Sequence, residues 1–211
     1  MAKGMTITSV ETQVKNPERV SVFIDGEFSF GISAGDALYY KLNAGEEISG
    51  EKYAKIMDEL VLTKAKNHAL SYLGFRARTE KEMRVYLSGK EYGGAVTDEV
   101  IELLYKYKYL DDYEFAKTFV SESLRLKKWG FRKIEYELRL KGVDSEIISR
   151  VWSESEIDQT ETILHLLDKK CGSCNFEEMD FKEKRRIVSY LQGRGFAYGD
   201  IEEAIAKRRQ D

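Results

Sequence analysis

The first fifty residues alternate apolar and polar positions with a period of two. Around an Asp25-Gly26 pair, the apolar positions are Val20, Val22, Ile24, Phe28, Phe30 and Ile32. An Asp-Gly pair between two alternating runs is a strong signal for a β-hairpin. Residues 5–14 are rich in Thr and Val and predict a further strand, with Asn16-Pro17 as its turn. We therefore predict a small N-terminal β unit.

After Ser33 the period of the apolar positions changes to three and four. The spacing predicts amphipathic helices and is clearest at Tyr53, Ile56, Leu60, Ala65, Ala69 and Leu73. The single proline, Pro17, lies before this region, so no proline interrupts the helices that follow. We expect helices from here to the C-terminus.

The helical region repeats itself. Ile134, Leu138, Gly142, Val143 and Ile148 have counterparts 53 residues later, which are Ile187, Leu191, Gly195, Phe196 and Ile201. A third copy places Leu87 51 residues before Leu138. Each copy predicts three helices that bury little apolar surface alone and must stack on their neighbours. The predicted fold class is mainly α, with tandem three-helix repeats in an elongated curved array behind the β unit.

The expected domains are residues 1–59 for the β unit with short helices, then three repeats at 60–110, 111–156 and 157–211. Helix starts are predicted from capping residues, which are Thr79 with Glu82 in a capping box, Thr97 or Asp98, Asp111 or Asp112, and Asp144. Gly130 and Gly142 are expected to end helices, Gly130 in the left-handed conformation.

The composition excludes several classes of protein. The 211 residues are 42% hydrophobic and 34% charged, with a net charge of −3. No apolar run approaches the roughly 20 residues that span a bilayer, and the N-terminus lacks an apolar signal core. We expect a cytoplasmic monomer that does not enter membranes and has no cofactor.

The sequence motif CGSC contains the two cysteines, Cys171 and Cys174, and could indicate a redox or zinc site. A helix that ends in lysines precedes it and an acidic segment follows. His68 and His165 are the only histidines and do not form a second ligand pair. We favour an inert turn, and full activity of a double serine variant would exclude the redox and zinc hypotheses.

The sequence contains no motif of an enzyme active site. The phosphate-binding loop, the dinucleotide-binding glycine motif, H-E-x-x-H and G-x-S-x-G are all missing. Asp111-Asp112 is the one conspicuous carboxylate pair, and its place before an amphipathic helix favours capping. We expect a protein that is not an enzyme.

The segment from Phe115 to Gly142 is strongly basic, with eight Lys or Arg against three Glu. Arg132, Tyr136 and Arg139 share one helical face, whereas the core stripe is Phe131, Ile134 and Leu138. Trp129 is expected to pack under the bend.

Basic segments occur in all three repeats. Each one alone is interpreted as a solvated helix face, but three in equivalent places could together bind a polyanion or an acidic groove of a protein. The candidate binding residues are Arg76, Arg78, Arg84, Arg125, Lys127, Lys128, Arg132, Lys133, Arg139, Lys141, Lys184, Arg185 and Arg186.

These residues resemble a known family. The segment from Tyr109 to Val143, with Leu110-Asp111-Asp112, Phe115-Ala116 and Lys141-Gly142, resembles the central signature of the RecX regulatory proteins. The run from Ala69 to Met83 looks like the first repeat of that family, and YLQGRGF (Tyr190 to Phe196) looks like its third. The resemblance covers roughly residues 60–209.

The resemblance implies tandem modules that bind the RecA recombinase filament on single-stranded DNA. Such proteins usually restrain strand exchange, ATP turnover and coprotease activity, which implies a role in homologous recombination, DNA repair and the SOS response. The alternative hypothesis is a helical-repeat protein that binds DNA directly and competes for it. End capping, filament disassembly and groove binding all remain open as modes of action.

Overall fold

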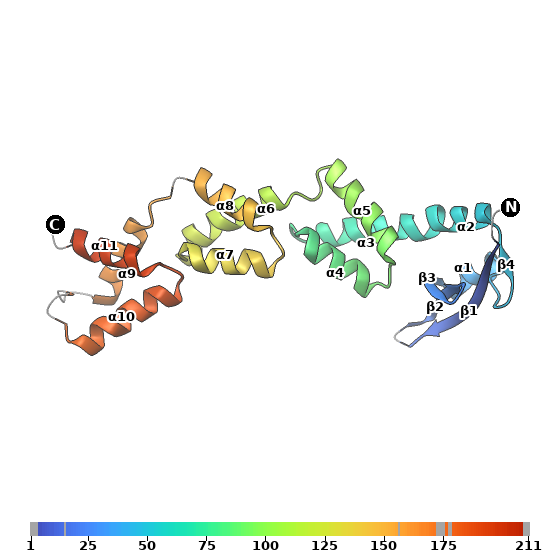
Figure 1. Cartoon of the computed structure of the whole chain (residues 1–211), viewed down its shortest axis with the longest axis horizontal. Coiled ribbons are helices and arrows are strands. Elements are labelled where there is room, and N and C mark those ends of the chain that lie inside the picture. The colour runs from blue at the N-terminus through green and yellow to red at the C-terminus, as the bar shows by residue number, and fades with distance from the viewer. Residues whose placement is uncertain (1–3, 15, 156, 172–175, 177–178, 209–211) are drawn as a thin grey trace. The chain divides into compact units, whose positions relative to one another are not determined.

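The computed structural model describes residues 4–14, 16–155, 157–171, 176 and 179–208. It divides into two compact units, one up to Asp111 and one from Asp112 onward. The first unit contains β1 (Met5–Gln13), β2 (Asn16–Ile24), β3 (Glu27–Ser33), α1 (Ala34–Tyr39), β4 (Glu47–Ile48), α2 (Gly50–Ile56), the π-helical η1 (Met57–Leu62), α3 (Thr63–Leu73), α4 (Glu80–Gly89) and α5 (Gly94–Lys106) (Figure 1). The second contains α6 (Asp112–Glu122), the π-helical η2 (Ser123–Lys127), α7 (Phe131–Leu140), α8 (Ser145–Glu154), α9 (Thr160–Cys171), α10 (Phe181–Gly193) and α11 (Tyr198–Arg208). The protein is therefore mainly helical, with three tandem three-helix repeats behind a small antiparallel strand unit, as predicted.

The N-terminal strands form one antiparallel sheet in the order β3-β2-β1-β4. Asp25 and Gly26 both have positive φ, 51° and 88°, which a tight two-residue hairpin requires. The predicted hairpin and the further strand β1 are confirmed. The two-residue β4, which pairs with β1 through Met5 and Ile48, was too short for the alternation to predict.

The predicted turn at Asn16-Pro17 is wrong. Both residues belong to β2, and Asn16 pairs with Gln13 of β1, so the chain reverses before Asn16. Pro17 lies beside the register shift between Thr12 and Gln13 of β1, and proline, which lacks an N–H donor, is tolerated at such irregularities of a sheet.

The sheet and the first repeat share one apolar core. Helical structure runs without a break from Gly50 to Leu73 through α2, η1 and α3. Along it Ile56, Ala65 and Ala69 are fully buried, which confirms the predicted stripe. The core continues across both elements, from the sheet residues Val22 and Phe30 to the helical residues Met83, Leu87 and Val100.

Two of the predicted helix starts are confirmed in detail. Thr79 and Glu82 form a capping box, in which each side chain accepts a hydrogen bond from the other residue's backbone N–H. Asp144 caps α8 by accepting from the N–H of Glu146 at 2.7 Å. Helix α6 begins at Asp112, one of the two expected positions.

The predicted start at Thr97 or Asp98 is wrong, because both residues lie inside α5, which begins at Gly94. The apolar stripe explains the earlier start. Val96 is already buried, one turn before Val100, so burial favours helix one turn further upstream than the capping signal suggested.

The repeat is confirmed by burial of its counterpart positions. Leu87, Leu138 and Leu191 are all fully buried in their respective repeats. Gly142 and Gly195 both have positive φ, 85° and 94°, and each follows the middle helix of its repeat. The three repeats thus reuse one arrangement of apolar positions. The left-handed residue after the middle helix is a glycine in the second and third repeats and Glu91, with φ 63°, in the first.

Gly130 does not close the preceding helix in the left-handed conformation, as the sequence led us to expect. That conformation belongs to Lys128, whose φ is 53°, whereas Gly130 has φ −85° and is the N-cap of α7. A side chain at Gly130 is excluded for another reason, because a Cβ there would lie 2.6 Å from the carbonyl carbon of Gly195.

This close approach joins the second repeat to the third. The N–H of Gly130 donates to the carbonyl of Arg194 at 2.8 Å, and the N–H of Arg132 donates to the carbonyl of Gly195 at 3.1 Å. The first N–H groups of a helix have no partner within it, so carbonyls that follow α10 satisfy the start of α7.

Candidate functional site

Helix α7 separates an apolar face from a basic, aromatic face. Ile134 and Leu138 are fully buried in the core of the second repeat. Arg132, Tyr136 and Arg139 are exposed, and 61% of the Tyr136 surface is accessible. The predicted layering of this helix is confirmed.

The guanidinium group of Arg139 forms an exposed ion pair with Glu135, at 2.8 Å and one helical turn away. Such pairs on helix surfaces contribute only about 0.3–0.5 kcal/mol. Arg139 can therefore exchange this partner for a carboxylate or phosphate of a binding partner at little cost.

Trp129 packs against the core of the second repeat and is half-buried, so the packing interpretation is confirmed. Two lysines flank its ring, with the Lys127 Nζ atom 4.2 Å and the Lys133 Nζ atom 4.8 Å from the ring centroid. The indole quadrupole attracts both ammonium groups and holds them at the surface near the start of α7.

Arg194, which the sequence analysis did not select, anchors the bend before α7. Its guanidinium group donates to the carbonyl of Lys127 at 2.6 Å and to that of Lys128 at 3.4 Å, and lies 5.1 Å from the Tyr190 ring centroid. The Lys127 and Lys128 backbones are thereby fixed by the third repeat. No local pattern in the sequence indicates this role, because the two carbonyls that Arg194 contacts lie 67 and 66 residues earlier in the chain.

Two further predicted lysines lie over aromatic rings. The Lys141 Nζ atom is 5.8 Å from the Phe115 ring centroid, and the Lys184 Nζ atom is 5.9 Å from that of Phe176. Both distances are near the roughly 6 Å limit of a cation–π contact, so each ring attracts its ammonium group only weakly.

In the first repeat, two predicted arginines are engaged by carboxylates. Arg76 makes two hydrogen bonds to Glu82, at 3.0 and 3.2 Å, and Arg84 bonds to Glu80 at 2.7 Å and to Asp98 at 2.6 Å. These bonds raise the pKa of both guanidinium groups. Both arginines therefore support the fold of the first repeat more than they offer free positive charge.

Arg78 belongs to a stack of cations and rings. Its guanidinium carbon lies 3.8 Å from the Tyr72 ring centroid, and the Tyr72 and Tyr86 rings stack at 4.0 Å with an interplanar angle of 5°. The Lys90 Nζ atom lies 5.7 Å from the Tyr86 centroid. The stack holds a positive charge at each end.

Arg185 and Arg186 lie exposed on α10. They stand 53 residues after Arg132 and Lys133, at the equivalent positions of the third repeat. In the first repeat the equivalent positions hold one basic and one acidic residue, Lys81 and Glu82. The paired basic positions are thus a property of the second and third repeats.

The histidines and the described cysteine do not form a chemical site. The hydroxyl group of Tyr92 lies 2.8 Å from the Nδ1 atom of half-buried His68, and burial lowers the pKa of this imidazole. His165 is exposed, and Cys171 is buried at the end of α9, while the rest of CGSC lies outside the described residues. Within the described ranges, no three His, Cys, Asp or Glu side chains gather as a metal site would need.

None of the helices in those ranges is both long and apolar enough to cross a bilayer.

The fold and this surface define a class of protein, namely helical-repeat proteins with basic positions repeated on the surface of the second and third repeats. Four family models match the chain in order: the regulatory protein RecX N-terminal domain at residues 5–49, and the first, second and third RecX three-helix domains at 65–104, 111–151 and 156–205. The chain belongs to the RecX family of regulatory proteins.

Individual relatives agree with this assignment. Regulatory protein RecX of Clostridium acetobutylicum is 34% identical over 204 residues, which are 95% of this chain and 94% of that protein. Regulatory protein RecX of Bacillus subtilis is 34% identical over 203 residues, which are 94% of this chain and 75% of that protein.

Crystal structures show the same fold. A structure of regulatory protein RecX has a TM-score of 0.63 at 21% identity and covers 94% of this chain and 97% of its own. The structure of RecX from Lactobacillus salivarius has a TM-score of 0.65 at 24% identity and covers 71% of this chain and 97% of its own.

Proposed function

We propose that this protein binds the RecA filament on single-stranded DNA and inhibits its recombinase, ATPase and coprotease activities, acting in the cytoplasm as a monomer without enzymatic activity. The family assignment supports a regulatory role. The observation that carries the proposal is the exposed face of α7, where Arg132 and Arg139 flank Tyr136 above a buried stripe.

A filament of recombinase on DNA offers carboxylates and phosphates, and both accept hydrogen bonds from arginine in a bidentate geometry. The Lys127 and Lys133 ammonium groups on Trp129 extend the basic face around the start of α7. We propose that Arg125, Lys128, Lys141, Lys184, Arg185 and Arg186 widen the contact. Arg76, Arg78 and Arg84 contribute less because carboxylates or rings already engage them.

Direct binding to DNA is the second candidate function, and exposed Tyr136 is the observation that favours it. An aromatic ring between two arginines suits stacking on an unpaired base, which contributes about 1–3 kcal/mol per base. This candidate requires tight binding to bare oligonucleotide and a steep salt dependence, about −0.7 in log affinity against log salt per phosphate contacted.

The test of the proposal is the rate of RecA ATP hydrolysis on single-stranded DNA with increasing amounts of this protein. We expect inhibition by the wild type. The double variant Arg132→Glu/Arg139→Glu should need about tenfold more protein for the same effect, which corresponds to about 1.4 kcal/mol. A matched variant, Lys55→Glu/Lys66→Glu, reverses two charges in the first unit and should inhibit like the wild type.

Unchanged ATP hydrolysis with the wild type would contradict the proposal. Affinity for bare DNA equal to that for filaments would favour the second candidate. Circular dichroism of all variants checks that the helices remain folded.

A further inference from the structure

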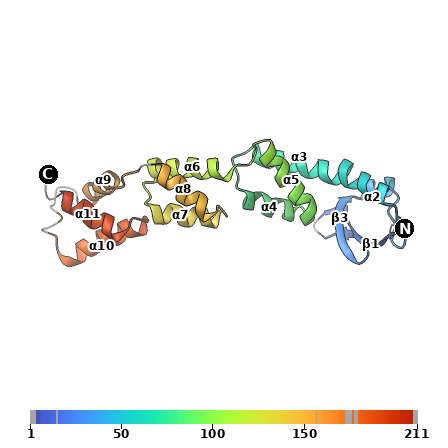
Figure 2. The ribbon, with the colours of Figure 1, turned by 45° about the horizontal axis from the view of Figure 1, so that its top comes forward.

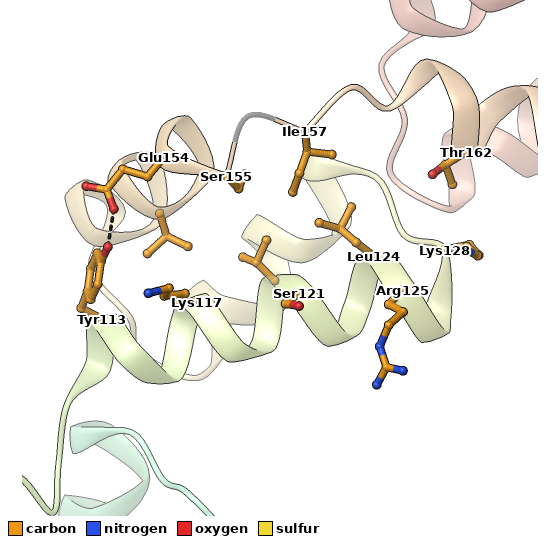
Figure 3. A pocket seen from close by; sticks show the side chains of 12 residues that line it. Tyr113, Lys117, Ser121, Leu124, Arg125, Lys128, Glu154, Ser155, Ile157 and Thr162 are labelled. Atoms are coloured by element: carbon orange, nitrogen blue, oxygen red, sulfur yellow. Dashed lines mark hydrogen bonds between the residues drawn. The ribbon is translucent and has the colours of Figure 1, made fainter.

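A hollow of about 490 Å³ opens between α6, α8 and the segment that leads into α9 (Figure 3). Its floor is apolar and is formed by Val120, Leu124, Val151 and Ile157. Figure 3 shows Leu124 of η2 and Ile157 of the connecting segment facing the hollow from two sides. Because α6 and α8 pack against each other (Figure 2), the floor is a fixed part of the second repeat.

The rim of the hollow is basic. Lys117, Arg125 and Lys128 line it, with Ser121 one turn after Lys117 and one turn before Arg125. This spacing places Lys117, Ser121 and Arg125 along one side of α6 and η2, and Lys128 follows as the C-cap of η2. Lys117 and Arg125 are exposed and Lys128 is half-buried. The rim thus presents three positive charges beside an apolar floor.

The lining holds one carboxylate, that of Glu154, and its oxygens already have partners. The hydroxyl of Tyr113 donates to it, and the Nε atom of Arg150 donates to it at 2.8 Å. These bonds, that of Tyr113 first, lower the pKa of Glu154. Glu154 is therefore held at one end of the hollow, where its charge acts on Lys117, which also forms an exposed ion pair with Glu114 at 3.9 Å. Figure 3 shows Arg125 and Lys128 at the opposite end from Glu154.

We propose that this hollow binds an acidic segment of a partner protein, which inserts one apolar side chain between Leu124 and Ile157 and places carboxylates on Lys117, Arg125 and Lys128. The charge of the rim selects the carboxylates and the floor selects the apolar side chain. A nucleic acid backbone would satisfy the rim but has no apolar group that fills the floor. The inference rests on the proposed function only for the identity of the partner.

The test uses a fluorescein-labelled synthetic peptide in which aspartates and glutamates flank a central leucine, with binding measured by fluorescence anisotropy. We expect the wild type to bind it. Ser121→Trp fills the hollow from an exposed position of α6, and Lys117→Glu/Arg125→Glu reverses the rim. Each variant should lose at least tenfold in affinity, whereas the control Lys55→Glu/Lys66→Glu should not.

Two further probes separate shape from charge. A peptide with serine in place of the leucine should bind at least tenfold more weakly, and thymidine oligonucleotide of equal charge should not displace the acidic peptide. Equal binding of both peptides, full binding by Ser121→Trp, or displacement by the oligonucleotide would overturn the inference.

The outcome is independent of RecA inhibition. Peptide binding without RecA inhibition would leave this site intact and refute the proposed function. Inhibition without peptide binding would refute this site and leave the proposed function intact.

Discussion

The peptide groups of Gly130 and Gly195 lie in direct contact, so that a Cβ atom on Gly195 would come within 2.9 Å of the Gly130 carbonyl oxygen and 2.4 Å of the Lys133 nitrogen. The contact brings the end of the middle helix of the third repeat onto the start of α7. It therefore fixes the helix that carries the proposed binding face relative to the third repeat.

The substitution Gly195→Ala should destabilise the second unit severely. Gly195 has φ +94°, so alanine would be strained even with free space, at roughly 1–2 kcal/mol, and its Cβ would also overlap Lys133, at roughly 1–3 kcal/mol. We expect a loss of about 2–5 kcal/mol in the free energy of unfolding, measured by urea titration of the circular dichroism.

Gly130→Ala isolates the steric contribution. The φ of Gly130 is −85°, which alanine adopts freely, so the expected loss of about 1–3 kcal/mol comes from overlap with the peptide group that joins Gly195 to Phe196. The matched control is Gly199→Ala in α11, where a Cβ meets no atom within 4 Å. Alanine should stabilise that helix by about 0.5–1 kcal/mol. Equal effects at Gly130 and Gly199 would contradict the close contact.

His68 should make stability depend on pH. Burial, together with the charges of Lys90, Arg19 and Lys64, lowers the pKa of this imidazole below its usual 6.5, and a neutral ring can accept a hydrogen bond from Tyr92. As the pH falls below about 6.5, the unfolded state therefore binds a proton before the folded state does. Stability should fall until the pH passes the folded pKa and then become constant.

The measurement is the urea midpoint between about pH 8 and pH 5 for the wild type and for His68→Gln. The wild type should lose more stability on acidification, by about 1.4 kcal/mol for each unit by which the two pKa values differ. Parallel profiles for the two proteins would show that His68 is not the group responsible.

The first repeat should respond differently from α7 to charge reversal. Arg76 and Arg84 are bonded to carboxylates within the first repeat, so Arg76→Glu/Arg84→Glu should lower stability by about 1–3 kcal/mol through repulsion. RecA inhibition by the variant that remains folded should stay within about threefold of the wild type. A loss of inhibition as large as that of Arg132→Glu/Arg139→Glu would place the first repeat within the contact.

Much of the fold could be predicted because burial repeats with the helical period. The spacing of Ile134 and Leu138 predicts a buried helix face, and their counterparts 53 residues later indicate the repeat. Local rules failed where packing outweighed them. Burial of Val96 makes α5 begin upstream of the expected cap at Thr97 or Asp98. Gly130 is required because its backbone contacts Gly195, which lies 65 positions later, and no local pattern in the sequence indicates that contact.

The candidate site was predictable to a smaller degree. The basic face of α7 followed from spacing alone, because it lies opposite an apolar stripe. The ion pair of Arg84 with Asp98 could not be foreseen, since Asp98 reaches Arg84 only through the packing of α5 on α4. The pair of Arg84 with Glu80 follows the i,i+4 spacing of one helix, which the sequence does show. The role of Arg194 likewise depends on the approach of two repeats.

The most direct test of the central claim is cosedimentation with RecA filaments assembled on single-stranded DNA with a slowly hydrolysed ATP analogue. This assay measures binding without ATP turnover. We predict that the wild type pellets with filaments and that Arg132→Glu/Arg139→Glu stays largely in the supernatant, while Lys55→Glu/Lys66→Glu pellets like the wild type. Equal pelleting of the α7 variant and the wild type would contradict the claim that α7 binds the filament.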